Sequence, residues 1–426
     1  MTDDGYTLGG LGPDIRVPAH SVDELLTRLE VDPRWTVSAL AEMLAATMEA
    51  DVVTHLLALL LDRFPERPAD PETIRAVFAP LIGERRHREF DDLAAPEMRF
   101  ELPELADYTD LAQWLNLTVG ELEWFADRGH WLRTKNATLQ HYRYWQVPKR
   151  DGVRMIEAPK PHLREIQRRL LRSVLDRVPP HRAAQGFVPG TSTASFGWPH
   201  TDRPVVVRVD LRNCFSSIGI ARVRAIFAAV GYDTTARVLA ELCTTTTPVA
   251  DLRGVDRRLA ALLHLRHLPQ GAPTSPALAN LVMRSMDRRI WGYAVRHGLR
   301  YTRYGDDLAI SGDQTDPDQV LWVVLRIIAD EGFTVHPDKT TIMYAHQRQH
   351  LAGLVVNDQP RVARRDYDNL RALLHNAVRT GAHAQNRSAH PDFRAHVHGK
   401  IAWIGATSPR RRAALLALAA HVDWQR

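Results

Sequence analysis

The chain has 426 residues, of which 45% are hydrophobic, so it is long enough for two or three domains with a sizeable core and gives no case for a disordered protein. The net charge of +5 is unevenly distributed: residues 1–100 carry 10 Lys and Arg against 19 Asp and Glu, and the remainder carries 45 against 31. The basic remainder fits a partner with a phosphate backbone, although basic faces are also common without ligands.

The cysteines and the N-terminus indicate where the protein works. Cys214 and Cys243 are the only cysteines, which excludes a disulfide framework and a cysteine-based zinc site and favours a reducing cytoplasm. Residues 1–4 are acidic where a signal peptide is basic, and the apolar run Val52–Leu61 is too short to span a membrane. We therefore expect a cytoplasmic protein with no membrane partner.

The first 100 residues predict a small helical module that ends in a charged patch at residues 84–92. Its helical patterns alternate with Pro-containing breaks and fall at Val22–Leu29, Val37–Met48, Asp51–Phe64 and Pro71–Ile82. The module contains no catalytic constellation. Its role is open between partner binding, RNA binding and packing, and its acidity argues against a nucleic-acid face.

A basic hairpin is predicted after a helical lead-in at residues 101–145. Within Val147–Pro159, Lys149 and Arg154 flank an Asp151-Gly152 turn, so two strands would place both cations at one end, where they could meet a triphosphate. A solvated basic loop is the usual fate of an isolated pattern of this kind, and only the motifs further along the chain favour nucleotide binding.

A valine-rich run at 204–210 predicts a buried strand that ends in Asp210. Such a strand can hold a carboxylate rigidly. Phe215 follows five residues later and could lie over the sugar of a nucleotide, where it would leave no room for a 2′-hydroxyl and favour deoxynucleotides. An ordinary core phenylalanine is the alternative.

A turn at Gln270-Gly271 leads into a helix that is predicted over Ala277–Ile290. Gly271 would let the backbone approach a nucleotide, and Gln270 could hydrogen-bond to it. Taken alone, the segment is only a helix-entry loop.

The most informative segment is Arg303–Ser311, because Asp306 and Asp307 stand there between two runs of strand-forming residues. A tight Gly305 precedes the acidic pair, so the pattern predicts two short strands that meet at it. A lone Asp-Asp pair is usually a pair of solvated loop charges. The Asp210 strand supplies the context that changes this interpretation.

Asp210, Asp306 and Asp307 converge if this hairpin pairs beside the Asp210 strand. Three hard oxygen donors suit magnesium better than any softer metal. Two Mg²⁺ ions roughly 3.5 to 4 Å apart could activate a primer 3′-hydroxyl and stabilise the leaving pyrophosphate. The three carboxylates therefore predict nucleotidyl transfer.

The C-terminal part predicts a loop with Lys339 and then helices over Tyr367–Thr380 and Pro409–Val422. Lys339 could supply charge or a proton near the pyrophosphate, although an exposed lysine after Pro337-Asp338 is usually a turn residue. A histidine-rich tract fits a solvated or RNA-facing surface better than a metal site: His383, His390, His396 and His398.

These motifs, in this order, resemble those of bacterial retron-type reverse transcriptases from roughly Tyr108 to the C-terminus. Tyr304–Asp307 matches the family's Tyr-x-Asp-Asp box, and Asp210–Phe215 matches its metal-binding strand. Val147–Pro159 resembles the fingers hairpin, and Leu163–Leu171 resembles the helix after it. Leu268–Asn280 resembles the Gln-Gly-x-x-x-Ser-Pro segment. Gly332–Thr340 resembles the last palm segment, and Gly353–Asn357 resembles the primer grip.

The resemblance implies an α+β right-hand polymerase with fingers, a palm of antiparallel sheet flanked by helices, and a helical thumb. The expected domains are an N-terminal helical extension at 1–100, fingers and palm with a helical lead-in at 101–350, and primer grip with thumb at 351–426. The implied catalytic residues are Asp210, Asp306 and Asp307, and the implied metal ligands are these three and Leu211. The implied nucleotide-binding residues are Lys149, Arg154, Phe215, Gln270, Gly271 and Lys339.

An RNA-directed DNA polymerase of this kind implies an RNA template, a DNA or RNA primer, dNTPs and two Mg²⁺ ions as partners. It also implies a cognate noncoding RNA from which msDNA is made in anti-phage defence, and an effector protein is a further candidate partner. Two segments depart from the retron pattern: Phe196–His200 keeps only the His of an Asn-Ala-x-x-His element, and Leu351–Gly353 replaces Val-Thr-Gly. Because both are tied to recognition of the noncoding RNA, the polymerase chemistry follows more directly than msDNA synthesis.

Gly305 is a third departure, since retron enzymes usually place Ala there and Gly-Asp-Asp is typical of RNA-dependent RNA polymerases. Those polymerases usually have a second Asp at the position of Phe215, which favours reverse transcription here. The alternatives are a stand-alone defence reverse transcriptase outside the retrons, an RNA-dependent RNA polymerase, and an inactive nucleic-acid-binding scaffold.

Overall fold

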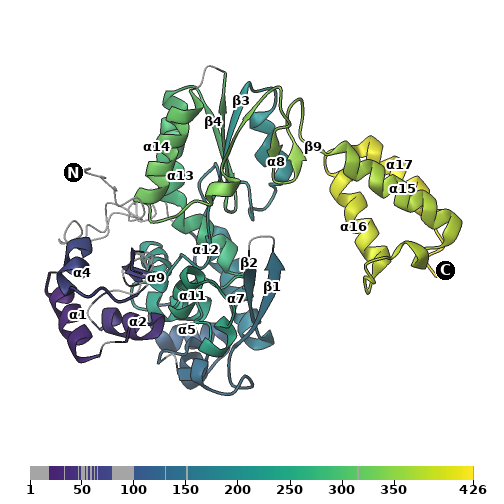
Figure 1. The fold of residues 1–426 in the computed structure, drawn as a ribbon. Helices are drawn as coiled ribbons and strands as arrows, with labels where there is room; N and C mark the ends of the chain where they lie inside the picture. The colour runs from purple at the N-terminus through teal and green to yellow at the C-terminus, as the bar shows by residue number, and fades with distance from the viewer. Residues whose placement is uncertain are drawn as a thin grey trace. The chain divides into compact units, whose positions relative to one another are not determined.

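The structure, a computed structural model, describes residues 19–78 with gaps at 33, 47, 49–52, 54–55, 58–59, 62 and 65, and residues 100–425 with gaps at 130, 150–151 and 314–315. The chain divides into two compact units (Figure 1). The first unit is Met1–His181, Leu211–Ile290 and Val323–Val335, and the second is Arg182–Asp210, Trp291–Trp322 and His336–Arg426.

The first unit begins with the helical module that the sequence predicts. Its helices are α1 (Ala19–Val31), α2 (Val37–Ala45) and α4 (Pro71–Phe78). Thr36 caps α2 by accepting a hydrogen bond from the backbone N–H of Ala39. Leucines of the module form a buried cluster that also includes Ala261 of α11 (Arg257–His264). The predicted helix at 51–64 is described only in part, and residues 79–82 and the charged patch at 84–92 lie outside the described residues.

The rest of the first unit contains the predicted basic hairpin, formed by β1 (Tyr142–Lys149) and β2 (Gly152–Pro159) in antiparallel pairing. Two capped helices precede it, and a capping box between Thr118 and Glu121 begins the second. These and the remaining elements are α5 (Tyr108–Leu115), α6 (Val119–Ala126), η2 (Trp131–Thr134), α7 (Pro161–Ser173), η3 (Leu175–Arg177), α9 (Ile220–Ala229), α10 (Ala236–Cys243), η5 (Val249–Leu252) and α12 (Ser275–Val282).

The single helix predicted over 277–290 is wrong in one respect, because the chain forms two helices there. α12 ends at Val282, and α13 (Arg284–Arg296) begins after Met283, whose ψ of 2° is not helical. Neither Gly nor Pro marks this break, so no local signal predicts it.

The second unit is built on a four-stranded antiparallel sheet with the order β4-β5-β3-β6. Its strands are β3 (Val205–Asp210), β4 (Arg300–Tyr304), β5 (Asp307–Gly312) and β6 (Thr341–Tyr344). The valine-rich β3 and the apolar β5 occupy the centre and are almost entirely buried, as the runs of β-branched and apolar residues predict (Figure 1).

The second unit ends in three helices around a core of their own: α15 (Arg364–Thr380), α16 (Phe393–Gly405) and α17 (Pro409–Ala419). The predicted C-terminal helices correspond to α15 and α17, and α17 ends three residues earlier than predicted. The other elements of this unit are α8 (Thr193–Gly197), η4 (Trp198–His200), η6 (Pro337–Lys339), β7 (His350–Leu351), β8 (Leu354–Val355), β9 (Arg361–Val362) and η7 (His383–Gln385), and α14 (Pro317–Asp330) is shared with the first unit.

Helices and antiparallel sheets together make a mixed fold that is compatible with the predicted α+β class. The predicted domain boundaries at residues 100 and 350 stay a prediction. Within the described part of the chain, none of the helices combines the length and the apolar character needed to cross a bilayer.

Candidate active site

Asp210 and Asp307 lie opposite each other in the sheet of the second unit. The antiparallel register of β3 and β5 pairs Val206 with Ser311, Arg208 with Ala309, and Asp210 with Asp307. Since side chains alternate between the two faces of a strand, these six residues share one face. The register thus confirms that the hairpin pairs beside the Asp210 strand, with two of the predicted carboxylates in one cross-strand pair.

The tip of the hairpin is the two-residue turn Gly305-Asp306 between the paired residues Tyr304 and Asp307. Gly305 has a φ of +64°, whereas Asp306 is not among the residues with positive φ, which is the pattern of a type II′ hairpin turn. Asp306 is exposed. The backbone conformation of the turn therefore explains the glycine at position 305, independently of any likeness to RNA polymerases.

The segment with Gly186 and Phe187 packs against this turn, and the contact leaves little room for a Cβ on Gly186 or on Gly305. A Cβ on Gly186 would lie 2.6 Å from the backbone nitrogen of Gly305, and a Cβ on Gly305 would lie 3.1 Å from Cε2 of Phe187. Arg303, which is fully buried, donates from Nη1 to the carbonyl oxygen of Gly305 at 2.9 Å. The position of the acidic tip is thus fixed from both sides.

Each paired carboxylate has a cation beside it. Arg208 Nε donates to Asp307 Oδ1 at 2.8 Å, and Lys339 Nζ donates to Asp210 Oδ1 at 3.1 Å. The backbone N–H of His336 also donates to the carbonyl oxygen of Asp210 at 2.8 Å, which ties η6 to the end of β3. The structure therefore brings Lys339 to the acidic pair and adds Arg208, which the sequence analysis missed.

Burial raises the pKa of Asp307 to about 6, and the neighbouring carboxylates of Asp210 and Asp306 act in the same direction. The ion pair with Arg208 opposes this shift. The carboxylate of Asp307 is therefore held in its charged form by cations, and a divalent ion would do the same more strongly.

The donor atoms fit magnesium. Both carboxylates supply hard oxygens, and Mg²⁺ is usually held by one or two carboxylates and substrate phosphates rather than by an all-protein cage. Across the residues that the structure covers, no three His, Cys, Asp or Glu side chains gather closely enough to form such a cage. The histidine-rich tract lies within these residues, and its lack of a metal site stays a prediction.

His200 is the one residue that this chain keeps from the Asn-Ala-x-x-His element, and it is fully buried against the sheet. Thr302 Oγ1 donates to the carbonyl oxygen of Phe196, so His200 Nε2 donates to Thr302 Oγ1 at 2.8 Å, and His200 Nδ1 accepts from Ser311 Oγ at 2.7 Å. Burial lowers the pKa of His200 to about 3, so the imidazole is neutral. In this chain His200 joins β4 to β5.

The remaining predicted residues belong to the first unit. The register of β1 and β2 pairs Lys149 with Gly152 and Val147 with Arg154, so Lys149 and Arg154 are exposed on one face at the turn end of the hairpin, as predicted. The Arg150-Asp151 part of the turn lies outside the described residues.

Gln270 and Gly271 lie against the hairpin strand β2. The backbone N–H of Glu157 donates to the carbonyl oxygen of Gln270 at 3.0 Å, and a Cβ on Gly271 would come within 3.1 Å of the carbonyl oxygen of Glu157. Phe215 is half-buried rather than a fully buried core residue, and Leu211 forms an isolated β-bridge with Val335.

The aromatic residues of β1 divide between the core and the surface. Tyr142 accepts a hydrogen bond from Gln167, and the hydroxyl of Tyr144 bonds to Thr245, so both side chains are held by partners within the protein. Trp145 is exposed. It remains a candidate to stack on a base.

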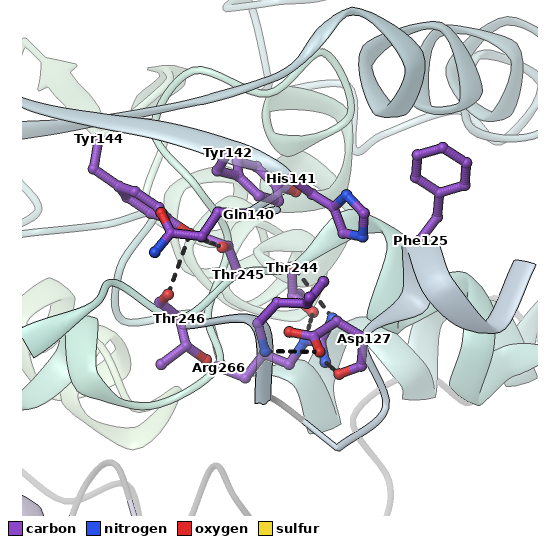
Figure 2. A pocket seen from close by; sticks show the side chains of 11 residues that line it. Phe125, Asp127, Gln140, His141, Tyr142, Tyr144, Thr244, Thr245, Thr246 and Arg266 are labelled. Carbon is purple, nitrogen blue, oxygen red and sulfur yellow. Dashed lines mark hydrogen bonds between the residues drawn. The ribbon is translucent and has the colours of Figure 1, made fainter. Parts of the chain in front are cut away.

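A narrow pocket of about 30 Å³ lies beside Tyr142 and Tyr144 in the first unit and contains none of the predicted site residues (Figure 2). Figure 2 shows Arg266 directed at Thr244 and Asp127, and this buried guanidinium donates to carbonyl oxygens at the ends of α6 and α10. The pocket holds water-sized groups only, so we assign its polar residues to the fold.

A comparison with known protein families finds a match that includes the acidic hairpin. Residues 147–370 match the family described as reverse transcriptase (RNA-dependent DNA polymerase), which covers the second strand of the basic hairpin, the acidic pair and Lys339. The protein is thus an RNA-directed DNA polymerase.

Curated relatives define its kind more closely. The chain is 36% identical to Retron Mx65 reverse transcriptase of Myxococcus xanthus over 76% of this chain and 75% of that protein. It is 36% identical to Retron Mx162 reverse transcriptase of the same organism over 74% and 67%, and 30% identical to Retron Ec86 reverse transcriptase of Escherichia coli over 55% and 69%. The chain belongs to the retron-type reverse transcriptases.

Proposed function

We propose that this reverse transcriptase extends a primer on a cognate noncoding RNA to make msDNA, and that it does so in the cytoplasm as part of an anti-phage defence system. The observation that supports the chemistry is the cross-strand pair of Asp210 and Asp307 with Asp306 in the adjoining turn. The retron relatives support the choice of template.

In the proposed mechanism, Asp210, Asp306 and Asp307 would hold two Mg²⁺ ions, with the backbone of Leu211 as a further ligand. The ions would supply Lewis-acid stabilisation of the attacking 3′-hydroxyl and of the leaving pyrophosphate. Arg208 keeps Asp307 charged and oriented between turnovers. Lys339 lies at Asp210, where its ammonium can meet a phosphate of the incoming nucleotide.

We assign the sheet of the second unit to the palm, β1 and β2 to the fingers, and α15–α17 to the thumb. In the fingers, Lys149 and Arg154 would contact the triphosphate from one face of the hairpin. Phe215 would exclude a 2′-hydroxyl, and Gln270 with Gly271 would form the backbone side of the nucleotide site. The domains at 1–100, 101–350 and 351–426 stay part of this proposal, with the first as a candidate surface for an effector protein.

Primer extension on an RNA template with Mg²⁺ tests the chemistry directly. The wild type is compared with Asp306→Ala/Asp307→Ala, each with dNTPs and with ribonucleotides. We expect DNA product from the wild type only. Ribonucleotide incorporation by the wild type would contradict the role of Phe215 and favour an RNA-dependent RNA polymerase.

RNA that co-purifies with the protein tests the retron role. We expect one discrete structured transcript and a DNA that is covalently joined to it. The DNA should be absent when both Asp306 and Asp307 are replaced by Ala. A bound RNA without attached DNA, from an enzyme that is active on added templates, would favour a stand-alone defence reverse transcriptase. Phage plating on cells with the wild-type or the double-variant locus then tests defence.

A further inference from the structure

A carboxylate and an imidazole that the proposed mechanism does not use are fully buried in the first unit. Glu157 lies on β2, and His267 lies three residues before Gln270. Glu157 Oε2 is 2.8 Å from His267 Nε2, and Glu157 Oε1 accepts a hydrogen bond from Thr247 Oγ1 at 2.6 Å. Glu157 is 0% exposed and His267 is 1% exposed, so neither group can be a solvated surface charge.

Every polar atom of this cluster has a partner. His267 Nδ1 lies 2.7 Å from the carbonyl oxygen of Leu265, which can only accept, so that nitrogen carries a proton. Burial acts to lower the pKa of His267, but the carboxylate of Glu157 outweighs burial and the net pKa is raised. A buried carboxylate–imidazole pair with these hydrogen bonds fixes the relative position of the two segments that carry it, because breaking it would leave buried polar groups without partners.

The two segments joined by this pair are the hairpin and the Gln270-Gly271 loop. On the loop side, His267 exchanges backbone hydrogen bonds with Thr245 at 3.0 and 2.9 Å, and Leu268 donates to Ile218 at 3.0 Å. On the hairpin side, the backbone of Glu157 bonds to Gln270 and approaches Gly271 so closely that a Cβ there would meet its carbonyl carbon and oxygen. The pair therefore lies at the base of a loop in which Gly271 is exposed and Gln270 is half-buried.

We propose that Glu157 and His267 are positioning residues that hold the Gln270-Gly271 loop in its nucleotide-binding conformation against the strand that carries Arg154. The inference rests on the proposed role of this loop in binding the incoming dNTP. Glu157 acts here through the loop and does not itself touch the nucleotide.

Two substitutions separate this role from a general contribution to folding. Glu157→Ala removes both hydrogen bonds and leaves His267 and Thr247 without their partner. Glu157→Gln keeps the shape and every hydrogen bond: the amide oxygen accepts from Thr247, and the amide N–H donates to a neutral His267 whose Nδ1–H still donates to Leu265. The two variants therefore differ in whether the hydrogen bonds to Thr247 and His267 are kept.

Steady-state primer extension with varied dNTP gives KM and kcat for each variant. We expect Glu157→Ala to raise the KM for dNTP on the order of 10-fold, as the loss of a buried charged hydrogen bond would, with kcat changed less than threefold. Glu157→Gln should keep KM within about twofold of the wild type. An unchanged KM in Glu157→Ala, with only a lower melting temperature, would overturn the inference.

Gln270→Ala is measured beside them, so that a failure of the inference can be told from a failure of the proposed nucleotide site. If Gln270→Ala raises KM and Glu157→Ala does not, the loop binds nucleotide and the positioning role is wrong. If Gln270→Ala leaves KM unchanged, the nucleotide role of the loop itself is wrong, and the inference falls with it.

Thr247→Val keeps the test decisive if Glu157→Ala does not fold. It removes one hydrogen bond to the carboxylate at nearly constant shape, and we expect a KM rise of about two- to fivefold. Hydrogen exchange gives a second measurement: the amides of Leu268, Gln270, Gly271, Ala272 and Thr274 should exchange faster in Thr247→Val while those of α7 do not change. Equal exchange at the loop would contradict the inference.

Discussion

Two places on one face of the four-stranded sheet differ in nearly every physical property, although β5 contributes to both. At one end, Asp210 and Asp307 form a pair of charged carboxylates with Lys339 and Arg208 beside them. Four residues further along the strands, roughly 13 Å away at 3.3 Å per residue, His200 is neutral and fully enclosed between Thr302 and Ser311.

The comparison shows how a sheet separates chemistry from stability. The carboxylates lie where the strands end and the turn begins, and each has a lysine or an arginine side chain beside it. The imidazole lies where both strands continue, and its two nitrogens are taken up by fixed partners. Substitutions at the open end should therefore change turnover, and those at the closed position should change unfolding.

The largest effect is expected at the open end. Asp210→Asn keeps the shape of the side chain but removes a charge from the proposed metal site, and we expect primer extension to fall by about 1,000-fold or more. The melting temperature should change by only a few degrees, because Lys339 is half-exposed and can return to solvent. Steady-state rates and a thermal melt of the same sample measure both.

Asp313→Asn is the matched control. Asp313 lies just beyond the other end of β5 and pairs with Arg203 at 2.7 Å, but it is largely exposed. Its loss should leave the rate within about twofold of the wild type. A similar loss of activity in both variants would show that any acidic residue of this sheet is essential, and the distinction between the two places would fail.

The next effect is expected at His200. His200→Ala leaves a cavity and two hydroxyl groups without their shared partner, and we expect the free energy of unfolding to fall by about 2–4 kcal/mol. Activity per folded molecule at low temperature should stay within a few-fold of the wild type. Urea unfolding and active-site titration check the two parts, and a 1,000-fold loss of activity in folded protein would contradict the structural role.

The pH dependence of the unfolding free energy gives a separate test of the role of His200. The pKa of His200 is lowered to about 3 in the folded chain and is about 6.5 in the unfolded chain, so the unfolded state binds the proton first as pH falls. The stability from the neutral imidazole is complete above pH 6.5 and is lost as pH falls toward 3. His200→Gln cannot titrate, and its unfolding free energy should therefore fall less steeply between pH 7 and 5, by up to about 1.4 kcal/mol per pH unit. Equal slopes would exclude this role.

Much of this site follows from sequence. The valine-rich strand and the hairpin with its acidic tip are local patterns, and antiparallel pairing then places Asp210 near Asp307. Arg208 could also have been found, because it lies two residues before Asp210 and alternation puts both on one face. The role of His200 could not, since its partners are more than 100 residues away. The same holds for Glu157 and His267, which are 110 residues apart.

The smallest effect is expected at the turn that leads into the open end. Gly305→Ala places a Cβ at a φ of +64°, which costs about 1 kcal/mol, and 3.1 Å from the ring of Phe187. Phe187 is exposed, so its ring can move away, and most of the loss should come from the backbone. We therefore expect Gly305→Ala to lower the unfolding free energy by about 1 kcal/mol and the rate by less than 10-fold, and Gly305→Ala in a Phe187→Ala background to show nearly the same loss. A loss that disappears in that background would assign the glycine to the contact with Phe187 rather than to the turn.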